Sequence, residues 1–136
     1  MNNNYKLDIA YIAGLFDADG SVSYKKYPKK RKGVKKDYMT WNIRLEISMT
    51  DKNVIELVHE TLMVGTFHKK PPGKNQLGKK MQYRWRCGYR DALYVCKLLW
   101  PYAVVKLHKI EQIIDHYEPD IQELGDNVVE LDTYRK

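Results

Sequence analysis

Hydrophobic and polar residues change their period several times along the chain, and each change marks the boundary of a predicted element. Apolar residues recur at helical spacing over residues 8–18, which predicts a helix that Asp8 caps and Gly20 stops. The pattern then alternates, and this period of two predicts a strand over residues 21–27 that ends at Pro28. The chain therefore opens with a helix that runs almost directly into a strand.

The next part of the chain contains one more strand, a helix and two further strands. The clearest strand covers residues 38–49, where apolar and polar side chains occupy alternate positions throughout. Helical spacing returns over residues 51–64. Two strands follow near residues 65–70 and 80–89, joined by a loop rich in proline and glycine.

Helical patterns close the domain. They cover residues 91–99 and 104–117, and each is followed by a proline. The order αββαββα, with a further helix at its end, predicts an α+β fold in which helices cover one face of a four-stranded antiparallel sheet. We expect residues 1–118 to form this domain and residues 119–136 to form an acidic helix or arm packed on it.

The sheet face that no helix covers is predicted to be polar and basic. Arg and Lys hydrogen-bond to guanine edges, and Asn and Gln to adenine edges, in a major groove that admits a two-stranded ribbon. The alternative is an ordinary solvated sheet face, which also alternates. The candidate DNA-binding residues are Ser23, Lys25, Tyr27, Lys29, Arg31, Tyr38, Asn42, Arg44, Ser48, His68, Lys70, Gln82, Arg84 and Arg86.

Charge supports a polyanionic partner. The formal net charge of +7 is uneven: residues 1–118 carry 22 Lys and Arg against 12 Asp and Glu, whereas residues 119–136 carry 2 against 5. Eight of the basic residues crowd into residues 25–36, enough to attract nucleic acid and release its counterions. A solvated, disordered basic loop would have the same composition, so charge alone does not decide between the two.

Other features exclude several classes of protein. The chain has 136 residues, which suits one domain. Cys87 and Cys96 lie in apolar runs without zinc-like spacing, so both are predicted to be reduced core residues, and a structural zinc is not expected. No apolar run approaches the roughly 20 residues of a membrane span. The protein is expected to be soluble and intracellular.

The segment Ile12-Ala-Gly-Leu-Phe-Asp-Ala-Asp-Gly20 closely resembles the signature of LAGLIDADG homing endonucleases and differs from it only at Ile12 and Phe16. In that family the motif is a helix that leads into the first strand of a four-stranded sheet with a concave DNA-binding face. The resemblance implies a double-strand DNA endonuclease that depends on Mg²⁺ and promotes homing of an intron or mobile element, with two or three divalent ions shared by a dimer.

Small residues in the motif helix point to close packing. Ala10, Gly14 and Ala18 recur every four residues, so one side of the helix has almost no side chains. Since the chain carries one motif and no internal repeat, the partner helix is expected from a second subunit on a two-fold axis. The alternative is packing against the subunit's own sheet. The expected homodimer interface comprises Ala10, Ala13, Gly14, Asp17 and Ala18, and the DNA target is expected to be long and pseudo-palindromic.

The two aspartates of the motif have different expected roles. They point roughly 200° apart on a helix, so they cannot do the same work. By the resemblance, Asp19 is the catalytic metal ligand, joined by the backbone carbonyl of Ala18, and Asp17 is structural. Without the rest of the motif, both would be read as residues of a helix end and turn.

Two further catalytic residues follow from the resemblance by position only. Asp51 falls where many relatives place a residue that orients water, and Lys106 falls where they place a basic residue. Asp51 would also serve as a helix cap, and Lys106 as a solvated lysine. An inactive DNA- or RNA-binding relative, such as a maturase or regulator, and an unrelated RNA-binding domain remain alternatives.

Overall fold

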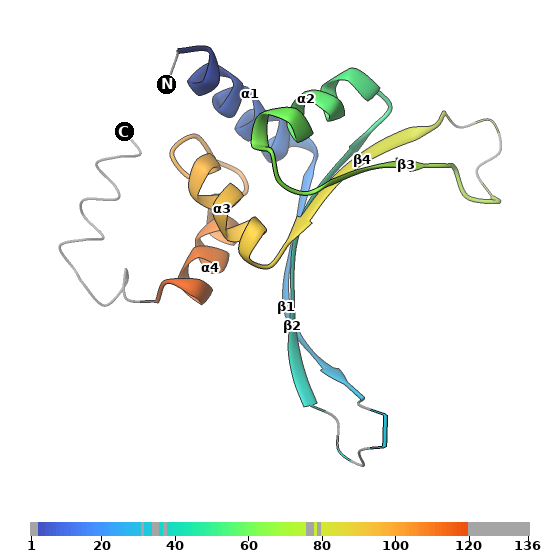
Figure 1. Cartoon of the computed structure of the whole chain (residues 1–136), viewed down its shortest axis with the longest axis vertical. Coiled ribbons are helices and arrows are strands. Elements are labelled where there is room, and N and C mark those ends of the chain that lie inside the picture. The colour runs from blue at the N-terminus through green and yellow to red at the C-terminus, as the bar shows by residue number, and fades with distance from the viewer. Residues whose placement is uncertain are drawn as a thin grey trace.

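The computed structural model describes residues 3–30, 32–33, 36, 38–75, 78 and 80–119, so the predicted acidic arm lies largely outside the described residues. Figure 1 shows the arrangement. In chain order the elements are α1 (Asn3–Asp19), β1 (Gly20–Lys29), β2 (Tyr38–Met49), α2 (Lys52–Leu62), β3 (Thr66–Lys70), β4 (Gln82–Gly88), α3 (Arg90–Leu99) and α4 (Leu107–Tyr117). The predicted α+β order is confirmed, with two helices after the last strand.

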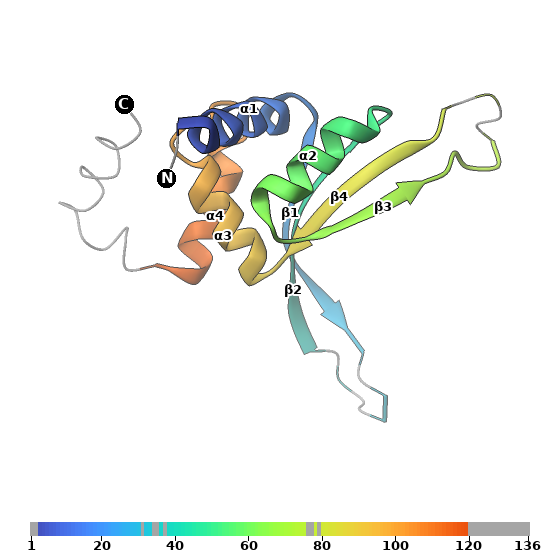
Figure 2. The same ribbon diagram turned by 45° about the horizontal axis from the view of Figure 1, so that its top comes forward.

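The four strands form one antiparallel sheet in the order β1-β2-β4-β3. The two hairpins overlap only briefly, because β2 pairs with β1 along residues 38–47 and with β4 along residues 44–49. Beyond that overlap each hairpin continues as a two-stranded ribbon, and the ribbons project in different directions (Figures 1 and 2). The sheet therefore consists of a central part, where the two hairpins pair, and two ribbons that extend from it.

Helices cover the apolar face of the sheet and enclose one core. The largest fully buried side chains come from strands and helices alike: Trp85, Phe16, Ile12, Ile43, Leu45, Ile47, Ile55, Leu62, Leu99, Ile110, Ile113 and Val58. Trp85 can be buried because its indole N–H donates to the Val64 carbonyl at 2.9 Å. Both cysteines are free and buried, as predicted.

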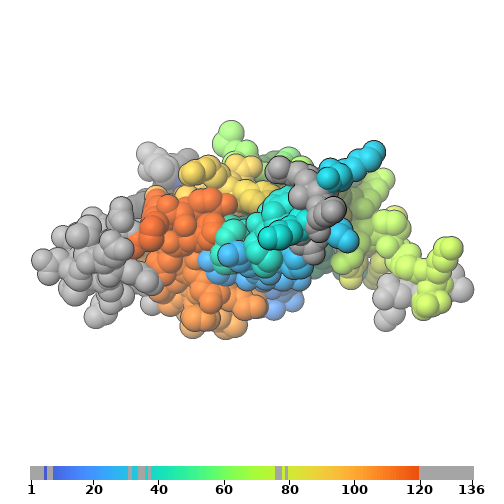
Figure 3. Space-filling view, turned by 90° about the horizontal axis from the view of Figure 1, so that it is seen from below, coloured from blue at the N-terminus to red at the C-terminus, as the bar shows by residue number. Residues whose placement is uncertain are grey.

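Helix α4 supports the β1–β2 ribbon beyond the reach of β4. The rings of Tyr24 and Trp41 stack at 4.8 Å, and His116 of α4 lies edge-on to both. The Tyr24 hydroxyl lies 3.2 Å from Nδ1 of His116. Seen from below, α4 (orange) lies directly against the two strands (blue to cyan) in Figure 3. The ribbon is thus fixed to the helical layer along part of its length.

Among the element boundaries that differ from the predictions, three concern α1, β1 and α4. Helix α1 begins at Asn3, so Asp8 lies inside the helix and does not cap it. Strand β1 continues through Pro28 to Lys29, because β1 is an edge strand, where a proline is tolerated. Helix α4 begins at Leu107, three residues later than predicted.

Candidate catalytic site and nucleic-acid interface

The end of the motif helix is fixed by its junction with the first strand. Asp19 is the last residue of α1 and Gly20 the first of β1, with no loop between them. A Cβ at Gly20 would lie 2.3 Å from Phe16 Cδ2 and 2.5 Å from the Phe16 carbonyl oxygen, so no larger residue fits this turn. Ala18 and Asp19 are exposed there. The junction therefore presents one carboxylate and the last carbonyl groups of the helix to solvent.

Asp17 and Lys106 connect this helix end to the segment before α4. The Asp17 carboxylate accepts hydrogen bonds from the backbone N–H groups of Val104 at 2.8 Å and Lys106 at 3.0 Å. In return, the Lys106 ammonium donates to the Asp17 carbonyl at 3.3 Å. Both oxygens of Asp17 are thus used within the subunit, which agrees with a structural role, and Lys106 lies beside the end of the motif despite its distance in sequence.

Asp51 lies at the same end of the sheet. Gly20 pairs with Ile47, and β2 ends only two residues later, so the residues that follow β2 approach the α1–β1 junction. Asp51 is the N-cap of α2, where one carboxylate oxygen accepts from the Val54 N–H at 3.2 Å. The capping role is therefore present, and a catalytic role for the exposed Asp51 remains a prediction.

The donors at this helix end suit a hard divalent cation. Carboxylate and backbone carbonyl oxygens, as Asp19 and Ala18 would provide, are the ligands that Mg²⁺ and Ca²⁺ prefer. Within the described part of the chain, no three His, Cys, Asp or Glu side chains gather into a metal-binding group.

One side of α1 is open, but Ala13 does not belong to it. Gly14 and Ala18 are exposed, and no described atom lies within 4 Å of a Cβ placed on Gly14. These two residues therefore do not pack against the subunit's own sheet, which was the alternative. Ala13 is only 1% exposed, because it lies in the same apolar stripe as Ile12 and Phe16. Its predicted place in a dimer interface is wrong.

The candidate DNA-binding residues share one face of the sheet, opposite the helices. The strand register pairs them directly: Ser23 with Arg44, Lys25 with Asn42, His68 with Arg84, and Lys70 with Gln82. Cross-strand partners point to the same side. Each described candidate is at least partly exposed. Arg31 lies outside the described residues.

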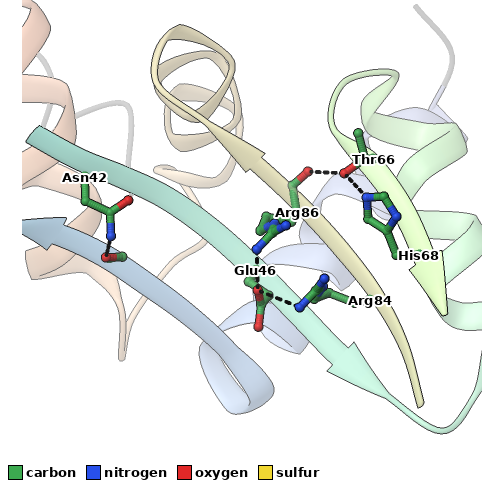
Figure 4. A network of polar contacts seen from close by, with 7 residues as sticks. Asn42, Glu46, Thr66, His68, Arg84 and Arg86 are labelled. Carbon is green, nitrogen blue, oxygen red and sulfur yellow. Dashed lines mark hydrogen bonds and ion pairs between the residues drawn. The ribbon is translucent and has the colours of Figure 1, made fainter. Parts of the chain in front are cut away.

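Side chains on this face are linked to one another (Figure 4). The Asn42 amide donates to the Ser23 hydroxyl at 2.8 Å. Across the face, Nε2 of His68 lies 2.9 Å from the Thr66 hydroxyl, which donates to the Arg86 carbonyl at 3.4 Å. Hydrogen bonds of this kind hold side chains in place before any ligand arrives. Thr66 was not among the predicted residues, although its register opposite Arg86 places it on the face.

Two further residues on this face were missed by the sequence analysis. Glu46 lies between Arg84 and Arg86 (Figure 4), 4.0 Å from each guanidinium. The alternation of β2 places Glu46 on this face, but Glu46 was not among the predicted DNA-binding residues. Tyr89 is 54% exposed, has a φ of 56°, and lines an open depression of about 430 Å³ together with Asn42, Arg44 and Arg86. The sequence gives no indication that this tyrosine has a positive φ.

Comparison with known proteins agrees with this geometry. The family model described as LAGLIDADG endonuclease matches residues 12–115. Among curated protein sequences, none matches significantly. Similar solved structures include the homing endonuclease I-CvuI in complex with the I-CreI target, with a TM-score of 0.70 and 17% identity over 96% of this chain and 78% of that one.

A second similar structure is the archaeal intron-encoded homing endonuclease I-Vdi141I complexed with DNA. Its TM-score is 0.61, and its identity is 17% over 94% of this chain and 84% of that chain. At these identities the structural likeness shows a shared fold. The family model covers more than half of the chain, and the chain belongs to the LAGLIDADG endonuclease family, with one copy of the motif. The class of protein is therefore a nuclease. No described helix is long and apolar enough to cross a membrane.

Proposed function

We propose that this protein is a homodimeric, site-specific DNA endonuclease. It makes a double-strand break at a long pseudo-palindromic target by Mg²⁺-dependent hydrolysis, and this cut promotes homing of an intron or mobile element. One observation carries the proposal: the motif helix ends with Asp19 exposed at the junction with β1, while the Lys106 ammonium lies 3.3 Å from the carbonyl of Asp17 in the same helix end.

The residues at this junction have separate tasks. Asp19 and the Ala18 carbonyl hold Mg²⁺, with two or three ions shared by the dimer. When bound, Mg²⁺ activates a water and neutralises charge on the phosphate. Lys106 presents a positive charge to the phosphate that is cut, because its ammonium is fixed near the end of α1. One oxygen of Asp51 caps α2, and the other orients water.

Dimerisation follows from the need to cut two strands. One subunit has one Asp19, and the exposed side of α1 around Gly14 and Ala18 allows a second backbone to approach closely. Packing two copies of this side about a two-fold axis brings the two Asp19 carboxylates together. Ala10, which is partly exposed, and the backbone near Asp17 complete the contact.

The polar sheet face binds the duplex. Its Lys and Arg side chains contact phosphates and guanine edges, while Asn42 and Gln82 offer amide groups to adenine. The two diverging ribbons reach along the groove on either side of the overlap between β2 and β4. The likeness to homing endonucleases solved with DNA supports this use of the face.

Selection of cleaved sites from a random duplex library tests the proposal. With Mg²⁺ the protein should enrich one long pseudo-palindromic site and cut both strands, and Asp19→Asn should bind the same site without cutting it. Glu60→Gln, a change of the same type at an exposed position on α2, should cut normally. Binding of one site without cleavage by the unaltered protein would support an inactive DNA-binding relative. Equal activity in Asp19→Asn would overturn the assignment of the site.

A further inference from the structure

One acidic residue lies in the middle of the basic sheet face. Glu46 is the only Asp or Glu in the four strands, which carry eight Lys and Arg. Its carboxylate lies 4.0 Å from Nη1 of Arg84 and 4.0 Å from Nη1 of Arg86 (Figure 4). Arg86 is the direct cross-strand partner of Glu46, and Arg84 is a diagonal neighbour. The sheet register therefore imposes this cluster of three charges.

A carboxylate at this position is unfavourable for DNA binding in general. It repels phosphates, and its single negative charge offsets one of the two positive charges of Arg84 and Arg86, which would otherwise attract them. Side chains on this face are partly withdrawn from water, with Glu46 21%, Arg84 24% and Arg86 33% exposed. Partial burial weakens screening of the charges. A phosphate must therefore compete with Glu46 for either guanidinium.

The ion pairs with Glu46 do not form hydrogen bonds with the two arginines. A separation of 4.0 Å exceeds the roughly 2.7–3.2 Å of a hydrogen bond. Among the described residues, Nε of Arg84 and the hydroxyl of its cross-strand partner Ser48 are buried without a hydrogen-bond partner. The 4.0 Å contacts with Glu46 therefore leave Nη1 of each arginine able to donate a hydrogen bond to another acceptor.

On the basis of the proposed DNA endonuclease function, we propose that Glu46 is a specificity-determining residue that makes this part of the face select a G·C pair. Guanine offers O6 and N7 to an arginine, and the cytosine amino group donates to a carboxylate. A G·C pair can therefore provide hydrogen-bond partners for two groups at once: guanine accepts from the arginine, and cytosine donates to Glu46. A phosphate satisfies only the arginine and leaves the carboxylate facing negative charge.

Binding to a 30-base-pair duplex of mixed sequence, without divalent ions, gives the first test. Glu46→Gln should bind this duplex about tenfold more tightly at 0.1 M salt. The slope of log K against log salt should also steepen by about one to two, since one or two arginines become free for phosphates. Glu56→Gln is the matched control, because Glu56 lies on α2 and pairs with Lys52 at 3.6 Å. The control should bind as the unaltered protein does.

Selection of bound sites from a random duplex library gives the second test. The unaltered protein should prefer a G·C pair at one or two positions in each half-site, and Glu46→Gln should lose that preference while the other positions stay unchanged. Glu46→Asp, which keeps the charge on a shorter side chain, should show a smaller change in the same direction. If Glu46→Gln lowers the melting temperature by many degrees, Glu46→Asp carries the comparison.

Two failures are distinguishable. If Glu46→Gln binds the mixed duplex no more tightly and selects the same sites, Glu46 is a structural ion-pair partner and this inference is overturned, while the proposed function stands. If the unaltered protein enriches no sequence at all, the proposed function fails and this inference with it.

Discussion

Two hydrogen bonds join Asp17 and Lys106, which lie 89 positions apart in the sequence. The carboxylate of Asp17 accepts from the Lys106 backbone, and the Lys106 ammonium donates to the Asp17 backbone. The exchange connects the end of the motif helix to the turn before α4. The first aspartate of the motif therefore helps to hold together the helix end that carries Asp19 and the turn that carries Lys106.

Removal of the Asp17 carboxylate should destabilise the fold. Asp17→Ala deprives two backbone N–H groups of a charged acceptor, at a cost of about 2 kcal/mol or more in the free energy of unfolding. Chemical denaturation measures the loss. A variant as stable as the unaltered protein would show that the turn before α4 finds other partners.

Lys106 should contribute to cleavage more than to stability. Lys106→Met should lower the cleavage rate by about 10²-fold, since a fixed positive charge near the phosphate is lost, while DNA binding changes little. Lys109→Met makes the same change at an exposed position of α4 and should leave the rate unaltered. Equal rates for both variants would place Lys106 outside the catalytic site.

Two substitutions of Asp51 distinguish its role as a helix cap from a role in catalysis. Asp51→Ala should cost about 1 kcal/mol of stability, whereas Asp51→Asn keeps a good N-cap and should unfold at nearly the same denaturant concentration. A rate loss of about 10²-fold in Asp51→Asn would then come from the carboxylate alone. Unchanged cleavage by this variant would leave Asp51 as a helix cap.

Two glycines of the motif should respond in opposite ways to the same substitution. Gly20→Ala places a Cβ 2.5 Å from the Phe16 carbonyl oxygen and should destabilise the subunit by about 2 kcal/mol or more. Gly14→Ala meets no described atom within 4 Å and should stabilise an isolated helix by about 0.5–1 kcal/mol. It should nevertheless weaken dimerisation, as measured by sedimentation. A Gly14→Ala dimer of full affinity would contradict the proposed interface.

The buried thiols make stability fall at high pH. Burial, and to a smaller degree Asp91, raises the pKa of Cys87 from 9.0 to about 12, and burial also raises the pKa of Cys96. The unfolded chain loses these protons near pH 9 while the folded chain keeps them, so stability is full below pH 9 and decreases as pH rises toward 12. Native protein at pH 8 should react with a thiol reagent far more slowly than unfolded protein. Fast reaction would show that the core opens readily.

Local pattern predicted much of this molecule. Alternation placed the polar side chains on one face, because the period of a strand is two regardless of its partners. It did not predict the Glu46 cluster, which depends on how β2 and β4 align, or the Asp17 bonds, which involve a turn without periodicity. Ala13 was misplaced because small residues suit a core stripe as well as an open one. Tyr89 is the one residue between β4 and α3, and its positive φ could not be predicted from the residue type.

The short overlap between the two hairpins divides the sheet into parts that can vary independently. Over residues 44–47, β2 pairs with both neighbours, and a substitution there disturbs three strands at once. Toward the other end, around Tyr27 and Thr40, only two strands meet. Substitutions can accumulate on these outer arms without cost to the common centre. A lineage of such enzymes could thus acquire new outer base-pair preferences while the inner ones stay fixed.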